Sequence, residues 1–542
     1  MNRKLGRPIL AFFLSVLAAL TALAGEAQAQ LIEKEIRRGV MENPIRLDPQ
    51  FATLPSERAI LADLFLGLVT EDAAGGIQPG AAESWEVRDA GLTWVFKLRA
   101  DQKWSDGRPL EAGDFEYAFR RLLAPESGAP FASMFYNISG AEALHKGRAD
   151  DLRSLGVAAR DKSTLIFELI ERSPQFLAQL VHHSAYPLRK DHVERTDESW
   201  TRPGKMVTNG PYVLSEWLPG KYVKLAKNWR FHDPASVTID NVYYDVVEFI
   251  ESATERFFAG DLHTLSEIPR EAIAGLMEAA PEVVRIYPSL TVDYLVINTR
   301  KPPFNDPRIR EALALAIDSP TLVRRVLDSG DIPADGLLPE GLAGIREPEP
   351  VLRKGPYPMP RPLSAEEKRD AAKLLLTDAG FGVQDTLRLT LNYNANGDHQ
   401  KIAEAVAGMW KRVGVRTDLY SNDYTVHYGD LGLGEFDIAR AGWIADYNDP
   451  GAFLMLFNAK SEQFNYGRFA DPEFEKLLAA AAKQEPPARA VTLHRAEQLA
   501  MEKFPIIPLY HHASRNLVAT SVSGWEDNVR DIHPSRYLEL KE

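Results

Sequence analysis

The stretch RAGWIADYNDP, residues 440–450, places a lone base and a lone acid beside two aromatic rings. The apolar run FDIARAGWI, residues 436–444, predicts a buried strand, and Asp446 follows its carboxyl end. In open α/β sheets, ligands bind in crevices at that end of the strands. A carboxylate shielded there can hold an ammonium group, because charge-assisted hydrogen bonds strengthen away from bulk water.

Each of these side chains also has a purely structural interpretation. Asp446 would form a turn, although Asp449 and Pro450 already supply the cap and the first residue of a helix over GAFLMLF. Arg440 would belong to a structural ion pair, and Trp443 would be a core residue. Since Asp446 has no evident structural role, we expect it to contact a ligand.

Signatures of catalysis are missing from the sequence. It has no G-x-S-x-G elbow, no Walker loop and no H-E-x-x-H motif. The histidine pairs 182–183 and 511–512 are adjacent, so the two rings of each pair diverge and cannot readily chelate one ion. We therefore expect no enzyme activity, no metal and no cofactor. The alternative is a secreted hydrolase whose acid and base lie far apart in sequence.

The amino terminus predicts a cleaved secretory signal peptide over residues 1–29. Three of the first seven residues are basic, namely Arg3, Lys4 and Arg7; an apolar run follows from Ile9 to about Ala24, and Ala27-Gln28-Ala29 matches a cleavage site. The alternative is a membrane anchor, but the apolar run is short for a bilayer span. The sequence lacks the cysteine of a lipoprotein anchor. We expect an unanchored protein of the bacterial periplasm that begins near Gln30.

Charge and composition limit the partners. The formal net charge is −13 at pH 7, and it becomes more negative once the basic signal peptide is removed. An acidic chain without a long basic run argues against nucleic acid and anionic membranes as partners. A length of 542 residues suggests two or three domains, and a hydrophobic content of 45% is enough to fill large cores.

Strand and helix patterns alternate along the chain. Residues 93–99 and 164–170 alternate like strands, and a helix is expected from an N-cap at Asp114. Further helices are expected over 305–317, capped by Asp306 with Pro307 at the first position, over 364–381 with a Ser364–Glu367 capping box, and over 399–415, followed by a strand at 416–420. This succession predicts an α/β fold. The proline-rich stretch Pro339–Pro362 is either a linker or, as we expect, an ordered surface loop.

Four sequence blocks in order resemble the family 5 extracellular solute-binding proteins. They are residues 82–125, beginning AESWEVRDAG and including KWSDG; residues 206–234, beginning MVTNGPYVL; residues 294–318, YLVINTRKPPFNDPRIREALALAID; and residues 436–457, FDIARAGWIADYNDPGAFLMLF. The last block is similar to the oligopeptide-binding branch in particular. Together the blocks extend the resemblance over nearly the whole mature chain.

The resemblance implies a two-lobed periplasmic-binding-protein fold, the Venus-flytrap fold, with an additional domain inserted in the first lobe. The discontinuous first lobe would comprise residues 30–65, 196–290 and 514–542. The additional domain would span 66–195, and the second ligand-binding lobe 291–513. The implied function is to capture peptides, short oligopeptides in particular, and to deliver them to a membrane ABC permease with its ATPases. We expect a monomer.

The resemblance also implies roles for individual residues. Asp446 matches an aspartate that holds the peptide α-ammonium, and Arg440 matches an arginine that can meet the carboxylate of a short peptide. His399 would lie at the same end as Arg440, or would be a surface residue at a helix start. The remaining expected contacts are pocket walls from Trp443, Tyr424 and Tyr447, backbone groups at Gly442 and Thr291, and the opposite lobe near Thr53 and Pro55.

One position departs from the family pattern. Some oligopeptide binders carry a second arginine nine residues before the position of Arg440, where this chain has Leu431. The loss of that cation puts the preferred ligand length in doubt. Dipeptides, cell-wall peptides, metal chelates and sugars are alternative ligands within the same fold. A receptor that reports its ligand to a membrane sensor is the alternative to transport.

Overall fold

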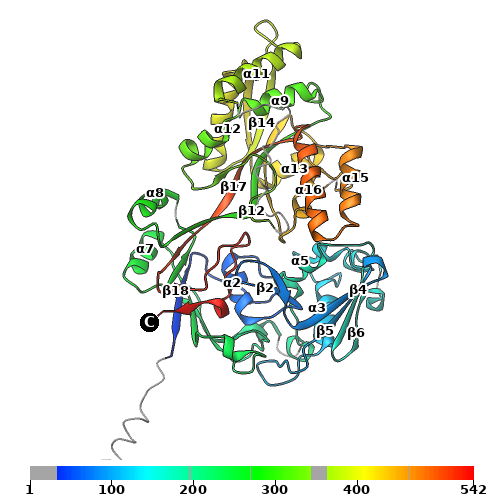
Figure 1. The fold of residues 1–542 in the computed structure, drawn as a ribbon, viewed down its shortest axis with the longest axis vertical. Helices are drawn as coiled ribbons and strands as arrows, with labels where there is room; N and C mark the ends of the chain where they lie inside the picture. Colours follow the sequence, from blue (N-terminus) through cyan, green and yellow to red (C-terminus); the bar gives the residue numbers. More distant parts are fainter. Residues whose placement is uncertain are drawn as a thin grey trace, which may run out of the picture.

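The computed structural model describes residues 33–149, 151–194, 197–268, 270–342, 363–461 and 463–541. The expected signal peptide and most of the proline-rich stretch lie outside these ranges. Figure 1 shows an upper and a lower lobe joined by long strands, with a further block of structure beside the lower lobe. No helix among the described residues is long and apolar enough to cross a membrane.

One sheet of 11 strands, built by the described residues, runs through both lobes in the order β15-β14-β16-β12-β17-β11-β1-β10-β9-β8, with β13 paired to β17. The long antiparallel strands β12 (Val284–Ile297) and β17 (Ile506–Val518) connect the lobes (Figure 1). Their register shifts between Pro288 and Val292 and again beside Asp293. Because such irregularities bend a strand, the connection is curved where the lobes meet.

The upper lobe packs helices on the three parallel strands β15, β14 and β16 and on the antiparallel strands beside them, and its apolar helix faces fill two cores. Trp410 of α12 is fully buried and donates Nε1–H to the Leu313 carbonyl at 3.0 Å. The elements are β13 (Ile332–Pro333), β14 (Arg388–Asn394), β15 (Arg416–Asn422), β16 (Ile438–Ile444), α9 (Pro307–Leu315), α10 (Ser319–Thr321), α11 (Ala365–Asp378), α12 (Gly397–Lys411), α13 (Tyr424–Leu433), α14 (Gly451–Leu454), α15 (Pro472–Ala481) and α16 (Pro486–Met501).

The lower lobe contains the other end of the sheet, in which β1 and β10 are parallel and β8, β9 and β10 form an antiparallel edge. Helix α2 lies on this sheet and packs into its core. The elements are β1 (Glu35–Val40), β8 (Tyr212–Leu218), β9 (Tyr222–Lys227), β10 (Asn241–Val246), β11 (Thr264–Ser266), β18 (Val522–Ser523), β19 (Glu539–Leu540), α2 (Pro55–Leu64), α7 (Ile250–Phe258) and α8 (Arg270–Ala279).

The block beside the lower lobe is built on a separate antiparallel sheet, β4-β5-β7-β6. Its buried aromatic residues belong to the same apolar cluster as the lower lobe, so the two share one core. The elements are β2 (Val69–Glu71), β3 (Ile77–Pro79), β4 (Ala82–Arg88), β5 (Thr93–Leu98), β6 (Val157–Asp161), β7 (Thr164–Glu168), α3 (Ala112–Leu122), α4 (Ala141–His145), α5 (Phe176–Leu180) and α6 (Lys190–Val193). The domain boundaries expected from the sequence stay a prediction.

Most of the expected elements are confirmed, and two helix starts are wrong. Helix α14 begins at Gly451 after an N-cap at Pro450, one position later than expected. Asp306 caps α9, and Ser364 and Glu367 form the capping box of α11. Helix α3, however, begins at Ala112 after an N-cap at Glu111. Asp114 lies three residues inside, where its carboxylate accepts hydrogen bonds from the Glu111 backbone and from the Trp104 indole, both at 3.0 Å.

A buried polar network ties the carboxyl-terminal segment to the lower lobe. Arg38 Nη1 donates to the Tyr244 hydroxyl, the Ser535 hydroxyl and the His533 carbonyl at 3.1, 2.9 and 2.9 Å. Asp63, which is fully buried, accepts from the Tyr244 hydroxyl at 2.8 Å and from the Ser535 backbone at 2.7 Å. Burial raises the pKa of Asp63, and the charge of Arg38 opposes that shift.

Replacing Arg38 by methionine should therefore destabilise the protein strongly. It would leave a buried carboxylate without its cation, a loss that costs about 3–5 kcal/mol in proteins. The matched control is Arg88→Met, which breaks an exposed ion pair with Glu86 and should leave the stability nearly unchanged. Urea unfolding of the three proteins measures both effects. Equal midpoints for the two variants would contradict the role given to Arg38.

Candidate functional site

Asp446 lies just past the carboxyl end of β16, as the sequence predicts. Its side chain contacts solvent and forms no hydrogen bond or ion pair within the described part of the chain. Protein atoms nevertheless surround it closely enough that desolvation raises the pKa of this carboxyl group. The opposing influence comes from two guanidinium groups outside the upper lobe, Arg58 of α2 and Arg530 of the carboxyl-terminal segment. Asp446 therefore faces the lower lobe across the cleft.

No further strand pairs with the edge of β16 beside Asp446 in the described part of the chain, and there the Gly442 N–H donates to the Tyr428 hydroxyl at 3.4 Å. β12 pairs with β16 along residues 438–444, whereas β14 reaches only to Ala439. Successive residues of a strand direct their backbone groups to opposite sides, so Gly442 and Ile444 direct theirs away from β12. An extended chain could add to the sheet here, within reach of Asp446.

Thr291, for which backbone contacts were expected, lies on β12 opposite Ile444. It belongs to the strand behind the free edge. The Thr291 side chain is half-buried.

Arg440 is buried at the floor of the cleft and is paired. Its Nε donates to Asp293 Oδ1 at 2.6 Å, and Nη2 contacts the same oxygen. Nη1 donates to Asn394 Oδ1 at 3.3 Å. Burial by itself would lower the pKa of Arg440, but Asp293, Tyr428 and Tyr510 together outweigh burial and raise it. The ion pair that was the structural interpretation of this arginine is therefore present.

The acid Asp293 has a second partner in His512, whose Nε2 lies 2.6 Å from Oδ2. Only 1% of the Asp293 side chain is exposed. Burial would raise its pKa, but Arg440 and His512 outweigh burial and lower it. This trio could not be recognised from the sequence, because Asp293 and His512 lie on β12 and β17, far from Arg440 along the chain.

His399 lies in the first turn of α12, with Nδ1 3.2 Å from the Asn394 carbonyl. Burial, followed by the charge of Arg440, lowers its pKa, so the ring is neutral near pH 7. It is half-buried beside the Arg440 end of the cleft, where the resemblance places it. Leu431, at the position of the missing arginine, is fully buried in the core of the upper lobe.

The expected aromatic walls have different surroundings. Trp443 is half-buried, with its indole N–H bonded to the Ala452 carbonyl at 2.8 Å and its ring against Phe464. Tyr424 is 67% exposed and stacks near Tyr428. Tyr424 is therefore available to a ligand, whereas Trp443 is anchored to the protein.

Tyr447 packs against the core of the upper lobe and is hydrogen bonded to Gln179 of α5. This contact joins the upper lobe to the block beside the lower lobe. The exposed ion pair Arg172–Glu485, at 2.6 Å, makes a second such contact.

The lower-lobe side of the cleft is held by Glu57 at the start of α2. Its carboxylate accepts four backbone N–H groups, from Ile45, Arg46, Thr53 and Leu54, at 2.8–3.1 Å. Thr53 and Pro55 are exposed on this rigid turn. Arg58 follows one residue after Glu57, and its Nε has no hydrogen-bond partner. From the sequence, Arg58 could be recognised only as an arginine near the start of a helix, and its place opposite Asp446 could not.

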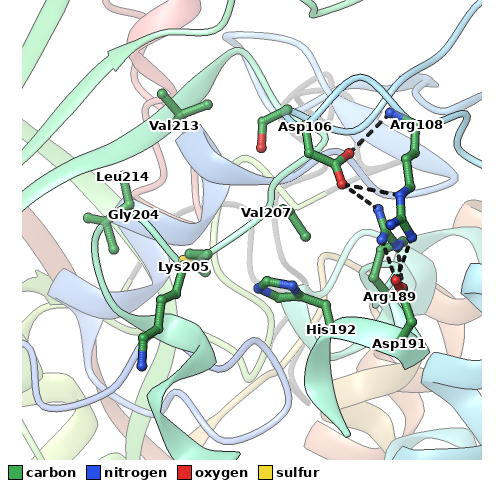
Figure 2. A pocket seen from close by; sticks show the side chains of 12 residues that line it. Asp106, Arg108, Arg189, Asp191, His192, Gly204, Lys205, Val207, Val213 and Leu214 are labelled. Carbon is green, nitrogen blue, oxygen red and sulfur yellow. Dashed lines mark hydrogen bonds and ion pairs between the residues drawn. The ribbon is translucent and has the colours of Figure 1, made fainter. Parts of the chain in front are cut away.

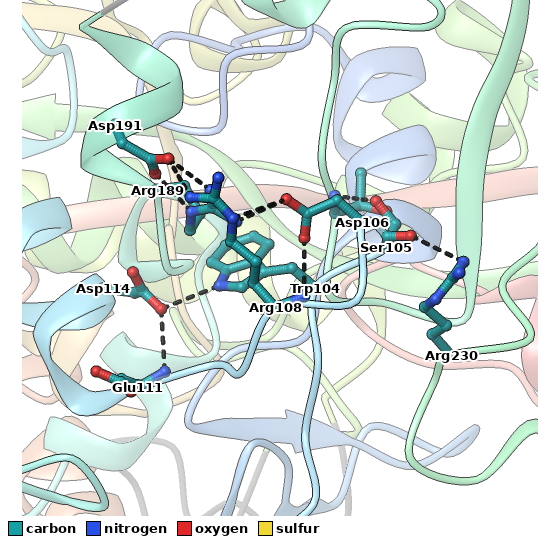
Figure 3. Close-up of polar contacts among 10 residues, drawn as sticks. Trp104, Ser105, Asp106, Arg108, Glu111, Asp114, Arg189, Asp191 and Arg230 are labelled. Atoms are coloured by element: carbon teal, nitrogen blue, oxygen red, sulfur yellow. Dashed lines mark hydrogen bonds and ion pairs between the residues drawn. The ribbon is translucent and has the colours of Figure 1, made fainter.

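A separate hollow of about 710 Å³ lies between the KWSDG loop, α6 and β8 (Figure 2). The aspartates and arginines that line it are paired with one another, and Lys205 donates to the Ser199 hydroxyl at 2.6 Å. Arg189 bonds Asp106 at 3.0 Å and Asp191 at 2.7 Å, and Arg108 bonds Asp191 at 2.5 Å. Figure 3 shows how this network continues through the loop to Trp104 and Asp114. The pairing cross-links the loop to α6 and leaves Asp446 as the stronger candidate for a ligand contact.

The raised pKa of Asp446 has a consequence for stability. An acid whose pKa is higher in the folded state than in the unfolded state destabilises the fold when it is ionised, and this penalty disappears as the pH falls below the unfolded value. Asp446→Asn should therefore stabilise the ligand-free protein at pH 7, and the gain should shrink as the solution is acidified. Urea unfolding of the wild-type protein and of Asp446→Asn, at pH 7 and at successively lower pH, measures the difference in stability. A destabilised Asn variant at pH 7 would contradict the desolvation argument.

Comparison with known proteins adds to this geometry. The profile of bacterial extracellular solute-binding proteins, family 5, matches residues 76–465. The periplasmic murein peptide-binding protein MppA of Escherichia coli is 35% identical over 94% of this chain and 93% of its own. The periplasmic oligopeptide-binding protein OppA of the same organism is 34% identical, over 94% of each chain.

The structure is similar to the unliganded open form of MppA, with a TM-score of 0.85, 34% identity and coverage of 94% of this chain and 98% of that chain. Another MppA structure, from Escherichia coli, gives 0.71 at the same identity, over 94% and 99% of the two chains. Since the identities are equal, the difference lies in conformation, and the lobes here are arranged as in the open form. The two-lobed α/β fold expected from the sequence is confirmed.

Proposed function

This chain belongs to the family 5 bacterial extracellular solute-binding proteins, and we propose that its cleft captures short oligopeptides by their terminal ammonium group. The family and the relatives named above are substrate-binding transport proteins and not enzymes. Their names place them in the periplasm and describe them as peptide-binding. Periplasmic peptide binding for an ABC importer is accordingly the function of this chain. The recognition chemistry is what the following paragraphs propose.

The observation that carries the proposal is the unpaired carboxylate of Asp446. It lies at the end of a free strand edge, protein atoms desolvate it, and no cation of the upper lobe neutralises it in the described part of the chain. Every peptide with a free amino terminus offers an ammonium group at a fixed position relative to its first backbone amides. Asp446 and the edge at Gly442 would bind these constant parts.

The lower lobe would complete the site when the lobes close. The exposed turn at Thr53 and Pro55 would offer contacts to the other side of the peptide, while Tyr424 would form one wall of a side-chain pocket. Bridging waters can fill the pockets around different side chains at little cost. We further propose that the closed monomer docks on a membrane permease with its ATPases.

Asp446→Asn should weaken the binding of trialanine by about one and a half to three and a half orders of magnitude. The reason is that removing one partner of a desolvated charge pair costs about 2–5 kcal/mol. Calorimetry with free and N-acetylated trialanine measures this, and acetylation should have a comparable effect on the wild-type protein. Asp378→Asn, an exposed position at the end of α11, is the matched control. Equal affinity for both peptides would refute the ammonium contact.

Peptide should also close the cleft, because a ligand that contacts both lobes favours the arrangement in which it touches both. Small-angle scattering of the wild-type protein should show a smaller radius of gyration when trialanine is added. Asp446→Asn at the same peptide concentration should show little change. An unchanged radius under saturating peptide would argue against capture by lobe closure.

A further inference from the structure

The two charged residues that flank the free edge of β16 are in opposite situations. Asp446, at one end, forms no ion pair among the described residues and is influenced only by guanidinium groups across the cleft. Arg440, at the other end, is engaged by Asp293 through two of its nitrogens. Among the described residues, the acid Asp446 at one end of the edge is therefore without an ion-pair partner, whereas the base Arg440 at the other end is paired with Asp293.

Among the described residues, no other arginine and no lysine contributes to the electrostatic surroundings of Arg440. The negative charge of Asp293 offsets the positive charge of Arg440, and the second carboxylate oxygen of Asp293, Oδ2, lies 2.6 Å from His512 Nε2. His399 is kept neutral near pH 7 by burial. The position where an additional arginine could stand is the apolar and fully buried Leu431.

A carboxylate that approached this end would gain little. It would meet the negative charge of Asp293 as well as the positive charge of Arg440, because Asp293 Oδ1 contacts both Nε and Nη2 of the same guanidinium, so the two Coulomb energies would partly cancel. It would also lose its hydration as the lobes closed, a cost that attraction must repay. A neutral amide or a continuing backbone would meet neither obstacle.

We propose that Asp293 is a specificity-determining residue that makes the cleft indifferent to the peptide's terminal carboxylate, so that the receptor selects its ligand by the amino terminus alone. The ligand class is peptides with a free amine, whether they end at Arg440 in an acid or an amide or extend beyond it. This inference rests on the proposed peptide-binding function and assigns Arg440 to the protein's own ion pair.

Calorimetry with trialanine and trialanine amide, and with the corresponding tetra-alanine pair, tests the proposal. In the wild-type protein the affinities within each pair should agree within about twofold. Asp293→Asn frees the charge of Arg440 and should create a preference of about tenfold or more for the free acid of the length that reaches it. Asp378→Asn, on the far side of the upper lobe, should leave the ratio unchanged.

Asp293→Asn leaves a lone buried charge and could unfold the protein, so a second variant is included. Asp293→Asn/Arg440→Gln removes both charges together and should keep the ratio of the wild-type protein. A tenfold loss of affinity for the free acids alone in this double variant would show that Arg440 anchors a carboxylate, and would overturn the inference.

Two further outcomes separate this inference from the function on which it rests. Binding of both peptides by the wild-type protein with a tenfold or greater preference for the acid would overturn the inference and leave the peptide-binding function in place. A folded Asp293→Asn variant without any acid preference would overturn the role of Asp293. Failure of every peptide to bind would overturn the proposed function and the inference together.

Discussion

The cleft depends on one electrostatic constraint, which is that a charge removed from water must find a partner. Arg440 meets the constraint within the protein, through Asp293 and the Asn394 side chain. Asp446 has no such partner among the described residues, and its desolvation raises its pKa. The closing of the lobes makes this unmet requirement stronger, since it removes the remaining water. Affinity for a cationic group follows directly from where the protein has left a charge unmatched.

The sheet explains how the two lobes hold such a site open. β12 and β17 belong to the same hydrogen-bonded sheet as the strands of both lobes, so the lobes are positioned by a continuous ladder of backbone bonds. The block on β4–β7 shares its core with the lower lobe, and it reaches the upper lobe through Gln179 and Arg172. The block therefore packs as part of the lower lobe and also contacts the upper lobe.

The sequence was informative where structure is set by near neighbours. The caps of α9 and α11, at Asp306 and Ser364, follow from residues two or three positions apart. The place of Asp446 follows from the end of one strand. The start of α3 was wrong because the carboxylate of Asp114 serves both the helix and the Trp104 indole, and composition alone does not choose between the cap and a position inside the helix.

The partner of Arg440 could not be found in this way, because Asp293 is 147 residues away and meets it only when β12 and β16 pair. The register irregularity beside Asp293 has a mechanical meaning as well. Strands that are hydrogen bonded to each other resist bending and keep a preferred curvature, whereas a flexible linker does not. Because β12 and β17 stay hydrogen bonded through the bend, the two lobes would move about the same strands each time cargo is taken up and handed over.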